Sequence, residues 1–168
     1  ATTGLSEKQE EKIKEAARII PIFRSANTSL GINVLLDLVK KATSILSDNF
    51  DIEIIEKHHN KKVDAPSGTA YMIASTINEE LHHSMKYNYG RQGNDSKRLE
   101  NEIGIHSVRG GTIPGEHIVI FAGLDEVIEI KHTALSKKIF AKQAIKAAEF
   151  IAHNKPQLYN MGDLMNQY

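Results

Sequence analysis

Three short apolar runs in the second half of the chain place the strongest constraint on its fold. Residues 103–109, 116–122 and 127–133 contain many β-branched side chains, and glycine-containing turns at 110–115 and 123–125 separate them. Runs of this length between turn residues predict β-strands, and short connections between consecutive strands predict antiparallel pairing. Because the run at 116–122 carries apolar side chains on both sides, both faces of the sheet need cover.

Helical periodicity elsewhere in the chain supplies cover for one face. Apolar stripes predict helices at residues 6–19, 34–46, 70–83 and 140–151. Further strands are expected at 21–23 and 51–59, and a polar surface excursion at 84–101. The predicted class is α+β, with a mixed, largely antiparallel sheet, helices on one face and the other face used for oligomerisation. The alternative is that loops of the same subunit bury that second face.

The composition excludes several function classes. Lysine plus arginine and aspartate plus glutamate each number 21, so no global field draws the chain to nucleic acid or an anionic membrane. The absence of cysteine excludes disulfides, thiolate metal sites and cysteine nucleophiles. No apolar run reaches the roughly 18–20 residues that a membrane span needs. We therefore predict a cytoplasmic protein with no nucleic-acid or membrane partner.

One segment, residues 56–70, joins the end of a predicted strand to the start of a predicted helix. The first N–H groups of a helix lack intrahelical partners and, with the helix dipole, can hold a carboxylate. Gly68 suits close backbone approach, and Ser67 and Thr69 add hydroxyl groups to the same volume.

Basic side chains precede this helix start. Lys62 supplies positive charge, and His58 or His59 can exchange protons near neutral pH. The set is suited to binding a small dianion while moving protons, as the reduction of a conjugated imine requires. Each part has a plainer alternative: strand-end histidines, a solvated lysine edge and a simple helix start. No metal site is predicted, because adjacent strand residues point to opposite faces and the other histidines lack ligand spacing.

The pattern Glu56-x-His58-His59-x-x-Lys62-x-Asp64-Ala65-Pro66-Ser67-Gly68-Thr69-Ala70 resembles the signature of 4-hydroxy-tetrahydrodipicolinate (dihydrodipicolinate) reductases. The resemblance extends through residues 1–4, 25–33 and 108–117. It implies an enzyme that reduces 4-hydroxy-tetrahydrodipicolinate, via dihydrodipicolinate, to tetrahydrodipicolinate in the diaminopimelate route to lysine. It also implies a Rossmann domain that binds NADH or NADPH, and a mixed-sheet domain that binds the small dicarboxylate substrate and builds a homotetramer.

The resemblance assigns roles to individual residues. His58 is the expected catalytic proton donor and acceptor, and Lys62 the second proton donor. The expected substrate contacts are His59, Ser67, Gly68 and Thr69. The expected cofactor contacts are Ala1, Thr2, Thr3, Ser25, Ala26, Asn27 and Thr28.

The resemblance also predicts a domain division. Residues 1–28 correspond to part of the nucleotide-binding domain, 29–153 to the substrate-binding and oligomerisation domain, and 154–168 to a segment returning toward the first domain. A Rossmann unit on the order of 100 residues or more is expected before Ala1. Without it we expect no hydride transfer. The alternative is a non-enzymatic oligomerisation or ligand-binding module derived from that enzyme.

Overall fold

The computed structural model describes residues 5–167. The chain divides into two compact units: residues 1–33 with 136–168, here called the terminal unit, and Val34–Leu135, called the central unit. The domain boundaries predicted from the sequence lie after residues 28 and 153. Among the described residues, no helix is long and apolar enough to cross a membrane.

The terminal unit is built around a two-stranded parallel sheet. Its helix α1 begins where predicted, because Ser6 and Gln9 form a capping box. Phe150 packs edge-to-face against Phe23 and Tyr159, with ring centroids 6.3 and 5.2 Å away. The strand and helix near the C-terminus have no counterpart in the prediction. The elements are α1 (Glu7–Ala17), β1 (Ile22–Phe23), α4 (Lys138–Ala152), β7 (Leu158–Tyr159) and α5 (Met161–Met165).

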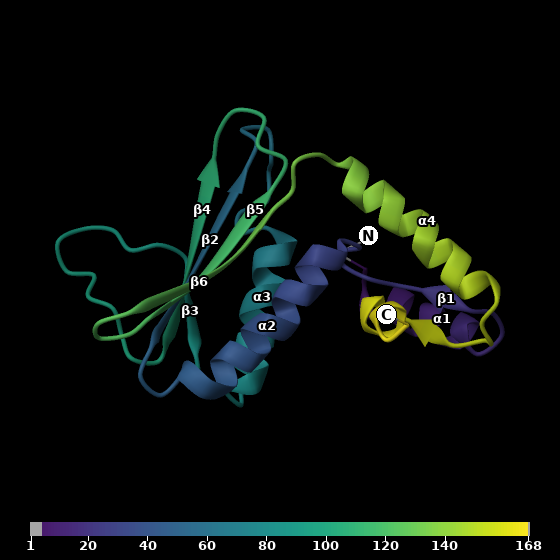
Figure 1. The fold of residues 1–168 in the computed structure, drawn as a ribbon, viewed down its shortest axis with the longest axis horizontal. Coiled ribbons are helices and arrows are strands. Elements are labelled where there is room, and N and C mark those ends of the chain that lie inside the picture. The colour runs from purple at the N-terminus through teal and green to yellow at the C-terminus, as the bar shows by residue number, and fades with distance from the viewer. Residues whose placement is uncertain (1–4, 168) are drawn as a thin grey trace. The chain divides into compact units, whose positions relative to one another are not determined.

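The central unit is a five-stranded sheet with two helices on one face (Figure 1). The first turn of α2 is assigned to the terminal unit. The strand order is β3-β4-β2-β5-β6. The elements are α2 (Leu30–Leu46), β2 (Asp51–His58), α3 (Gly68–Glu80), β3 (Lys86–Asn88), β4 (Glu102–Arg109), β5 (Glu116–Ala122) and β6 (Val127–Thr133).

The core of the central unit lies between these helices and the sheet. Alternate residues of the strands meet the apolar stripes of α2 and α3, as the two periodicities of strand and helix require. The α+β class and the mixed sheet are thereby confirmed. The buried cluster consists of Leu35, Val39, Ile52, Ile54, Ala70, Ile73, Ala74, Ile77, Ile103, Ile105, Val119 and Phe121.

The sheet is mixed, but the predicted direct pairing of the consecutive strands β4 and β5 is wrong. The β3–β4 and β2–β4 pairs are parallel, and the β2–β5 and β5–β6 pairs are antiparallel. Strand β2 lies between β4 and β5. The turn that connects β4 to β5 therefore passes the end of β2, where Gly110 N donates to His58 O at 2.9 Å. Alternation along a strand specifies which side chains are buried but not which strand is its neighbour. Fully buried Ile52 and Ile54 fit the central position that β2 occupies.

The polar segment 84–101 is also more ordered than predicted. It contains β3, which pairs with β4. Arg91 binds Glu53 at 2.7 Å and also binds Glu102, and Arg98 Nε donates to Glu53 at 3.2 Å. These contacts need Gly104 beside Glu53, because a Cβ at Gly104 would lie 1.8 Å from Glu53 Oε2. These ion pairs, the β3–β4 pairing and the packing of Met85 and Tyr87 against the core together hold this segment on the sheet.

Two leucines of α2 test this description of the core. Leu35 is 3% exposed and Leu38 is 53% exposed. We expect Leu35→Ala to lower the free energy of unfolding by about 2–5 kcal/mol, because it removes buried methyl groups and leaves a cavity. Leu38→Ala in the same helix should cost less than about 1 kcal/mol. Urea denaturation of both variants measures the difference, and equal losses would contradict the packing.

Candidate functional site

The predicted catalytic and substrate-binding residues gather where β2 ends and α3 begins. Strand β2 is central, so its last residues have neighbours on both sides: His58 stands opposite Arg109 of β4, and Glu56 stands opposite His117 of β5. The chain then turns back, and α3 starts after Ser67. The structure therefore adds two residues from distant strands to the local segment that the sequence identifies.

A buried carboxylate lies at the centre of this arrangement. The Glu56 side chain is 0% exposed. Its oxygens accept from both terminal nitrogens of Arg109 at 2.7 and 2.8 Å, and from Ser67 N at 3.1 Å. The distance between Glu56 Oε2 and His58 Nδ1 is 2.5 Å. Burial raises the pKa of Glu56, but hydrogen bonds from Arg109, His58 and Ser107 outweigh it and lower this pKa to about 2. Glu56 is therefore an anion.

His58 is a neutral imidazole near pH 7. Its side chain is 12% exposed, and burial lowers its pKa. The Glu56 carboxylate opposes this shift, whereas the positive charges of Lys62 and Arg109 add to it. A neutral imidazole with a depressed pKa can take up and release a proton, as the predicted role requires.

Ser67 caps α3 and contacts His117. Ala70 N donates to Ser67 Oγ at 3.1 Å, and Ser67 Oγ lies 3.0 Å from His117 Nε2. Ser67 is 2% exposed and His117 is 4% exposed. If the Ser67 hydroxyl donates to Nε2, the only side-chain polar atom of these two residues without a partner is His117 Nδ1. In the reverse assignment the hydroxyl hydrogen lacks an acceptor as well. In this structure the Ser67 hydroxyl is thus engaged in capping α3 and in contacting His117.

The remaining residues with predicted catalytic or substrate-binding roles lie in the same loop and in the first turn of α3. Lys62 Nζ donates to the carboxylate of Asp64 at 2.7 and 2.9 Å, and this hydrogen bond lowers the Asp64 pKa. His59 is half-buried, and its carbonyl accepts from Lys62 N at 3.1 Å. In the first turn of α3, Gly68 is exposed and Thr69 is half-buried. The structure thus brings His58, Lys62 and the helix start into one region.

Of the predicted cofactor residues, those in the loop 25–28 are described and belong to the terminal unit. Ala1, Thr2 and Thr3 lie outside the described residues. The side chains of the loop 25–28 are largely engaged in local contacts. Ser25 Oγ donates to Asn27 O at 2.7 Å, Asn27 Oδ1 accepts from Ser29 N at 2.8 Å, and Thr28 Oγ1 donates to Phe140 O at 3.3 Å. Ala26 is exposed.

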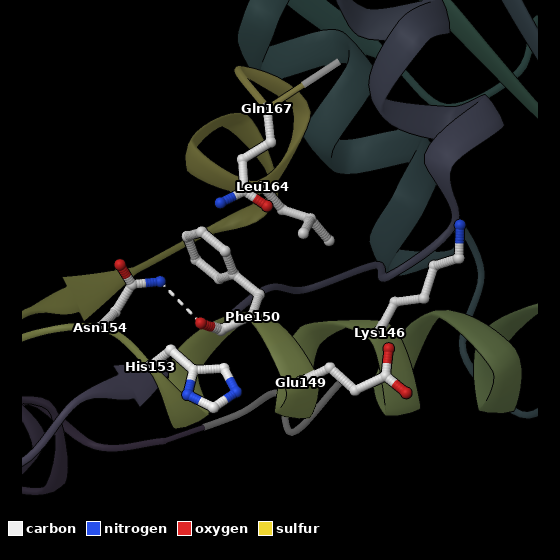
Figure 2. A pocket seen from close by; sticks show the side chains of 7 residues that line it. All are labelled: Lys146, Glu149, Phe150, His153, Asn154, Leu164 and Gln167. Carbon is white, nitrogen blue, oxygen red and sulfur yellow. Dashed lines mark hydrogen bonds between the residues drawn. The ribbon is translucent and has the colours of Figure 1, made fainter.

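A pocket of about 470 Å³ lies elsewhere in the terminal unit. Figure 2 shows the Phe150 ring and Leu164 between α4 and the C-terminal helix, with Lys146 and Glu149 further along α4. Asn154 closes one end by donating to Phe150 O at 2.6 Å. The sequence predicts no site here. The lining residues are Lys146, Glu149, Phe150, His153, Asn154, Leu164 and Gln167.

Glu56, Arg109 and His117 are the site residues to which the sequence assigns no role. Glu56 continues the alternation of Ile52 and Ile54 and so falls on the buried face. A buried carboxylate requires a cationic or hydrogen-bonding partner. That requirement signals a buried polar site, but the distant partner cannot be identified before the strand order is known.

The fold and the site define an α+β protein that places a histidine, a lysine and a helix start around one buried carboxylate. Comparison with known proteins identifies the family. The family model described as dihydrodipicolinate reductase, C-terminus, matches residues 31–165. The chain belongs to this family, and the resemblance seen in the sequence is confirmed.

Curated relatives support the assignment. A 4-hydroxy-tetrahydrodipicolinate reductase from Caldanaerobacter subterraneus is 59% identical over 99% of this chain and 66% of its own length. The enzyme of the same name from Clostridium novyi is 52% identical over 98% of this chain and 65% of its own length. The chain thus spans about 65% of the length of these relatives.

A solved structure has the same fold. It is described as dipicolinate-bound dihydrodipicolinate reductase from Paenisporosarcina sp. TG-14, and it matches with a TM-score of 0.71 and 24% identity. The match covers 95% of this chain and 61% of that one. At this identity the likeness supports the α+β architecture.

The buried histidine of the site generates a pH prediction. Burial, together with repulsion from His58, lowers the pKa of His117 from 6.5 to about 3. Unfolding therefore takes up a proton between these values, and the free energy of unfolding falls as pH is lowered through this window, by roughly 1.4 kcal/mol per pH unit at full proton uptake. His117→Gln should flatten this slope in urea denaturation series between about pH 7 and 5.

Other groups make a comparison of slopes necessary. The pKa values of His58 and His132 are also lowered by burial, so the wild-type slope contains their contributions. The difference between the wild-type and His117→Gln slopes isolates His117. Identical slopes would show that His117 is not held neutral.

Proposed function

We propose that this chain is the substrate-binding part of an enzyme that reduces 4-hydroxy-tetrahydrodipicolinate, via dihydrodipicolinate, in the diaminopimelate route to lysine. The observation that carries this proposal is that His58, Lys62 and the start of α3 lie close together around Glu56. Membership of the reductase family supports it. The two kinds of support are independent, since the geometry alone indicates proton transfer beside a small anion.

In this proposal each residue of the loop has a defined task. The backbone N–H groups of Gly68 and Thr69 bind a substrate carboxylate at the positive end of the α3 dipole. Ser67 holds that turn through its cap to Ala70 N. Lys62 Nζ donates to the substrate and is the second proton donor, His59 contacts the substrate, and the imidazole of His58 exchanges a proton with it.

NADH or NADPH is the proposed reductant, and its nicotinamide supplies a hydride when it is bound. The loop 25–28 fits such a group through its backbone, because Ser25, Asn27 and Thr28 use their side chains within the terminal unit. Exposed Ala26 presents a backbone surface without a bulky side chain. Hydrogen bonds from backbone amides and carbonyls suit a carboxamide, which has both a donor and an acceptor.

A homotetramer is the proposed assembly, built through the sheet face opposite α2 and α3. Ile55 and Ile118 stand in register on this face, and Ile120 lies beside them. Ion pairs from Lys57 and Lys131 to Glu116 flank this apolar row. An apolar centre with a charged margin is the usual anatomy of a protein interface.

Dipicolinate (pyridine-2,6-dicarboxylate), a planar dicarboxylate analogue, tests the binding site. We expect saturable binding in isothermal titration calorimetry, and Lys62→Ala should weaken it by about tenfold or more. A hydrogen bond to a charged group contributes roughly 1.5–3 kcal/mol, which is the reason for this magnitude. Lys61→Ala is the matched control, because Lys61 is the exposed neighbouring lysine and has no proposed contact.

This titration distinguishes a specific contact of Lys62 from a general electrostatic effect and from the absence of a preformed site. Loss of binding in Lys62→Ala alone supports the assigned site. Equal weakening by both substitutions would indicate a general electrostatic effect. Wild-type protein that does not bind dipicolinate at millimolar concentration would contradict a preformed site in this chain.

The interface is tested by Ile120→Lys. Ile120 stands between Glu53 and Glu129 in the sheet, so a lysine there has anionic neighbours and the subunit should stay folded. An apolar interface would nevertheless receive an unpaired charge from each copy. Sedimentation velocity should show a smaller species than the wild type, whereas Leu124→Lys, at a 96% exposed turn, should leave the assembly unchanged. A wild-type protein that sediments as a monomer would contradict the proposal.

A further inference from the structure

His58 has two ring nitrogens in different surroundings. Nδ1 lies 2.5 Å from the Glu56 carboxylate. Nε2 has no hydrogen-bond partner among residues 5–167, and a Cβ placed on Gly115 would lie 3.2 Å from it. Gly115 therefore leaves Nε2 uncovered by any side chain at that position. An ionised carboxylate only accepts, so the proton of the neutral imidazole is on Nδ1 and the lone pair is on Nε2.

The Glu56 carboxylate is fixed in place. Oε1 accepts from Arg109 and from Ser67 N, and Oε2 accepts from Arg109 and lies against His58 Nδ1. Each oxygen thus has at least two partners. Arg109 is fixed as well, since it also donates to Val108 O and to Asp64 O at 2.8 and 2.7 Å. The carboxylate cannot turn away from the imidazole without breaking these bonds.

The position of Glu56 is unusual for its strand. Ile52 and Ile54 precede it on the same face of β2 and are fully buried, so an apolar side chain would continue the core. A buried ion pair is weak evidence for stability, because well-packed apolar side chains often serve the fold equally well or better. A role beyond stability accounts for the charge at this position.

We propose that Glu56 is a positioning residue: it orients His58 with Nδ1–H toward the sheet, leaves Nε2 as the basic nitrogen, and aligns the start of α3 with that imidazole through Ser67 N. The inference deepens the proposed function and rests on it. Protons then enter and leave His58 at Nε2, and the Glu56 carboxylate stabilises the imidazolium that forms. A carboxylate that fixes the tautomer and orientation of a histidine is an established device of proton-transfer sites.

The charges around His58 make Glu56 the favourable partner of the protonated ring. The titratable and charged groups that face it are Glu56 of β2, Arg109 of β4, His117 of β5 and Lys62 of the loop. Lys62 and Arg109 oppose protonation, and the His117 ring lies 5.2 Å away edge-to-face. Glu56→Gln would remove the negative charge and leave the positive charges in place.

Nuclear magnetic resonance of the full chain with ¹⁵N-labelled histidine tests the proposal. Long-range ¹H–¹⁵N spectra distinguish the two neutral tautomers, and His58→Gln assigns the His58 signals. We expect wild-type His58 to favour the Nδ1–H form by about tenfold or more, as a hydrogen bond to a charged partner permits. Glu56→Gln should reduce this preference to less than about threefold and lower the pH at which His58 titrates; Glu56→Asp, which keeps the charge, should restore part of both.

The same strand supplies a matched control. Glu53 also binds an arginine and lies 2.7 Å from a histidine, His106, but it is on the opposite face of β2. Glu53→Gln should leave the His58 tautomer unchanged. A wild-type His58 in the Nε2–H form overturns the proposal even if Glu56→Gln fails to fold, and so does an unchanged tautomer in a folded Glu56→Gln protein.

This measurement needs neither cofactor nor turnover. If the tautomer is as expected but dipicolinate does not bind, the proposed function fails and the orienting contact stands. If dipicolinate binds and wild-type His58 is in the Nε2–H form, the positioning role fails and the proposed function stands. The two proposals can therefore fail separately.

Discussion

The ion pair between Glu56 and Arg109 is the constraint on which the arrangement of the site depends. A buried carboxylate is costly unless its oxygens are fully hydrogen-bonded. Glu56 meets this requirement only if β4 lies on one side of β2, to supply Arg109, and if α3 begins beside it, to supply Ser67 N. The parallel β2–β4 pair and the placement of α3 are thus linked to one carboxylate. The strand order and the candidate site are consequences of the same interaction.

Local features of the site could be predicted from the sequence, whereas its non-local partners could not. His58, Lys62 and Gly68 lie within one short segment, and their proximity follows from a strand, a turn and a helix start in succession. Arg109 lies 53 residues from Glu56, and Ser67 lies 50 residues from His117. Such contacts depend on which strands pair, and period-two alternation carries no information about that choice. The role of Ser67 illustrates the difference: its cap was predictable, but the engagement of its hydroxyl with His117 was not.

Each face of β2 has a glutamate that contacts an arginine and a histidine, but the two glutamates differ in burial. Glu53 and Glu56 each bind an arginine and a histidine, yet the Glu53 side chain is 18% exposed and that of Glu56 is 0% exposed. Burial raises the pKa of Glu53, but hydrogen bonds from Arg91 and His106 outweigh it and lower this pKa. The partly exposed cluster holds the polar segment 84–101 on the sheet, which composition alone could not reveal. The enclosed cluster instead acts on a histidine whose other nitrogen is uncovered.

The two ion pairs of the site differ in how easily they exchange partners. Arg109 and Glu56 are enclosed, so replacement of either partner would leave a buried charge unsatisfied. Lys62 binds Asp64, whose side chain is 60% exposed, and exposed ion pairs of this kind contribute little net free energy. A ligand carboxylate can therefore take the place of Asp64 on Lys62 at small cost, while the imidazole remains held by Glu56. Under the proposed function, this fixed imidazole beside an exchangeable cation lets the site accept an anion without rebuilding the geometry that proton transfer requires.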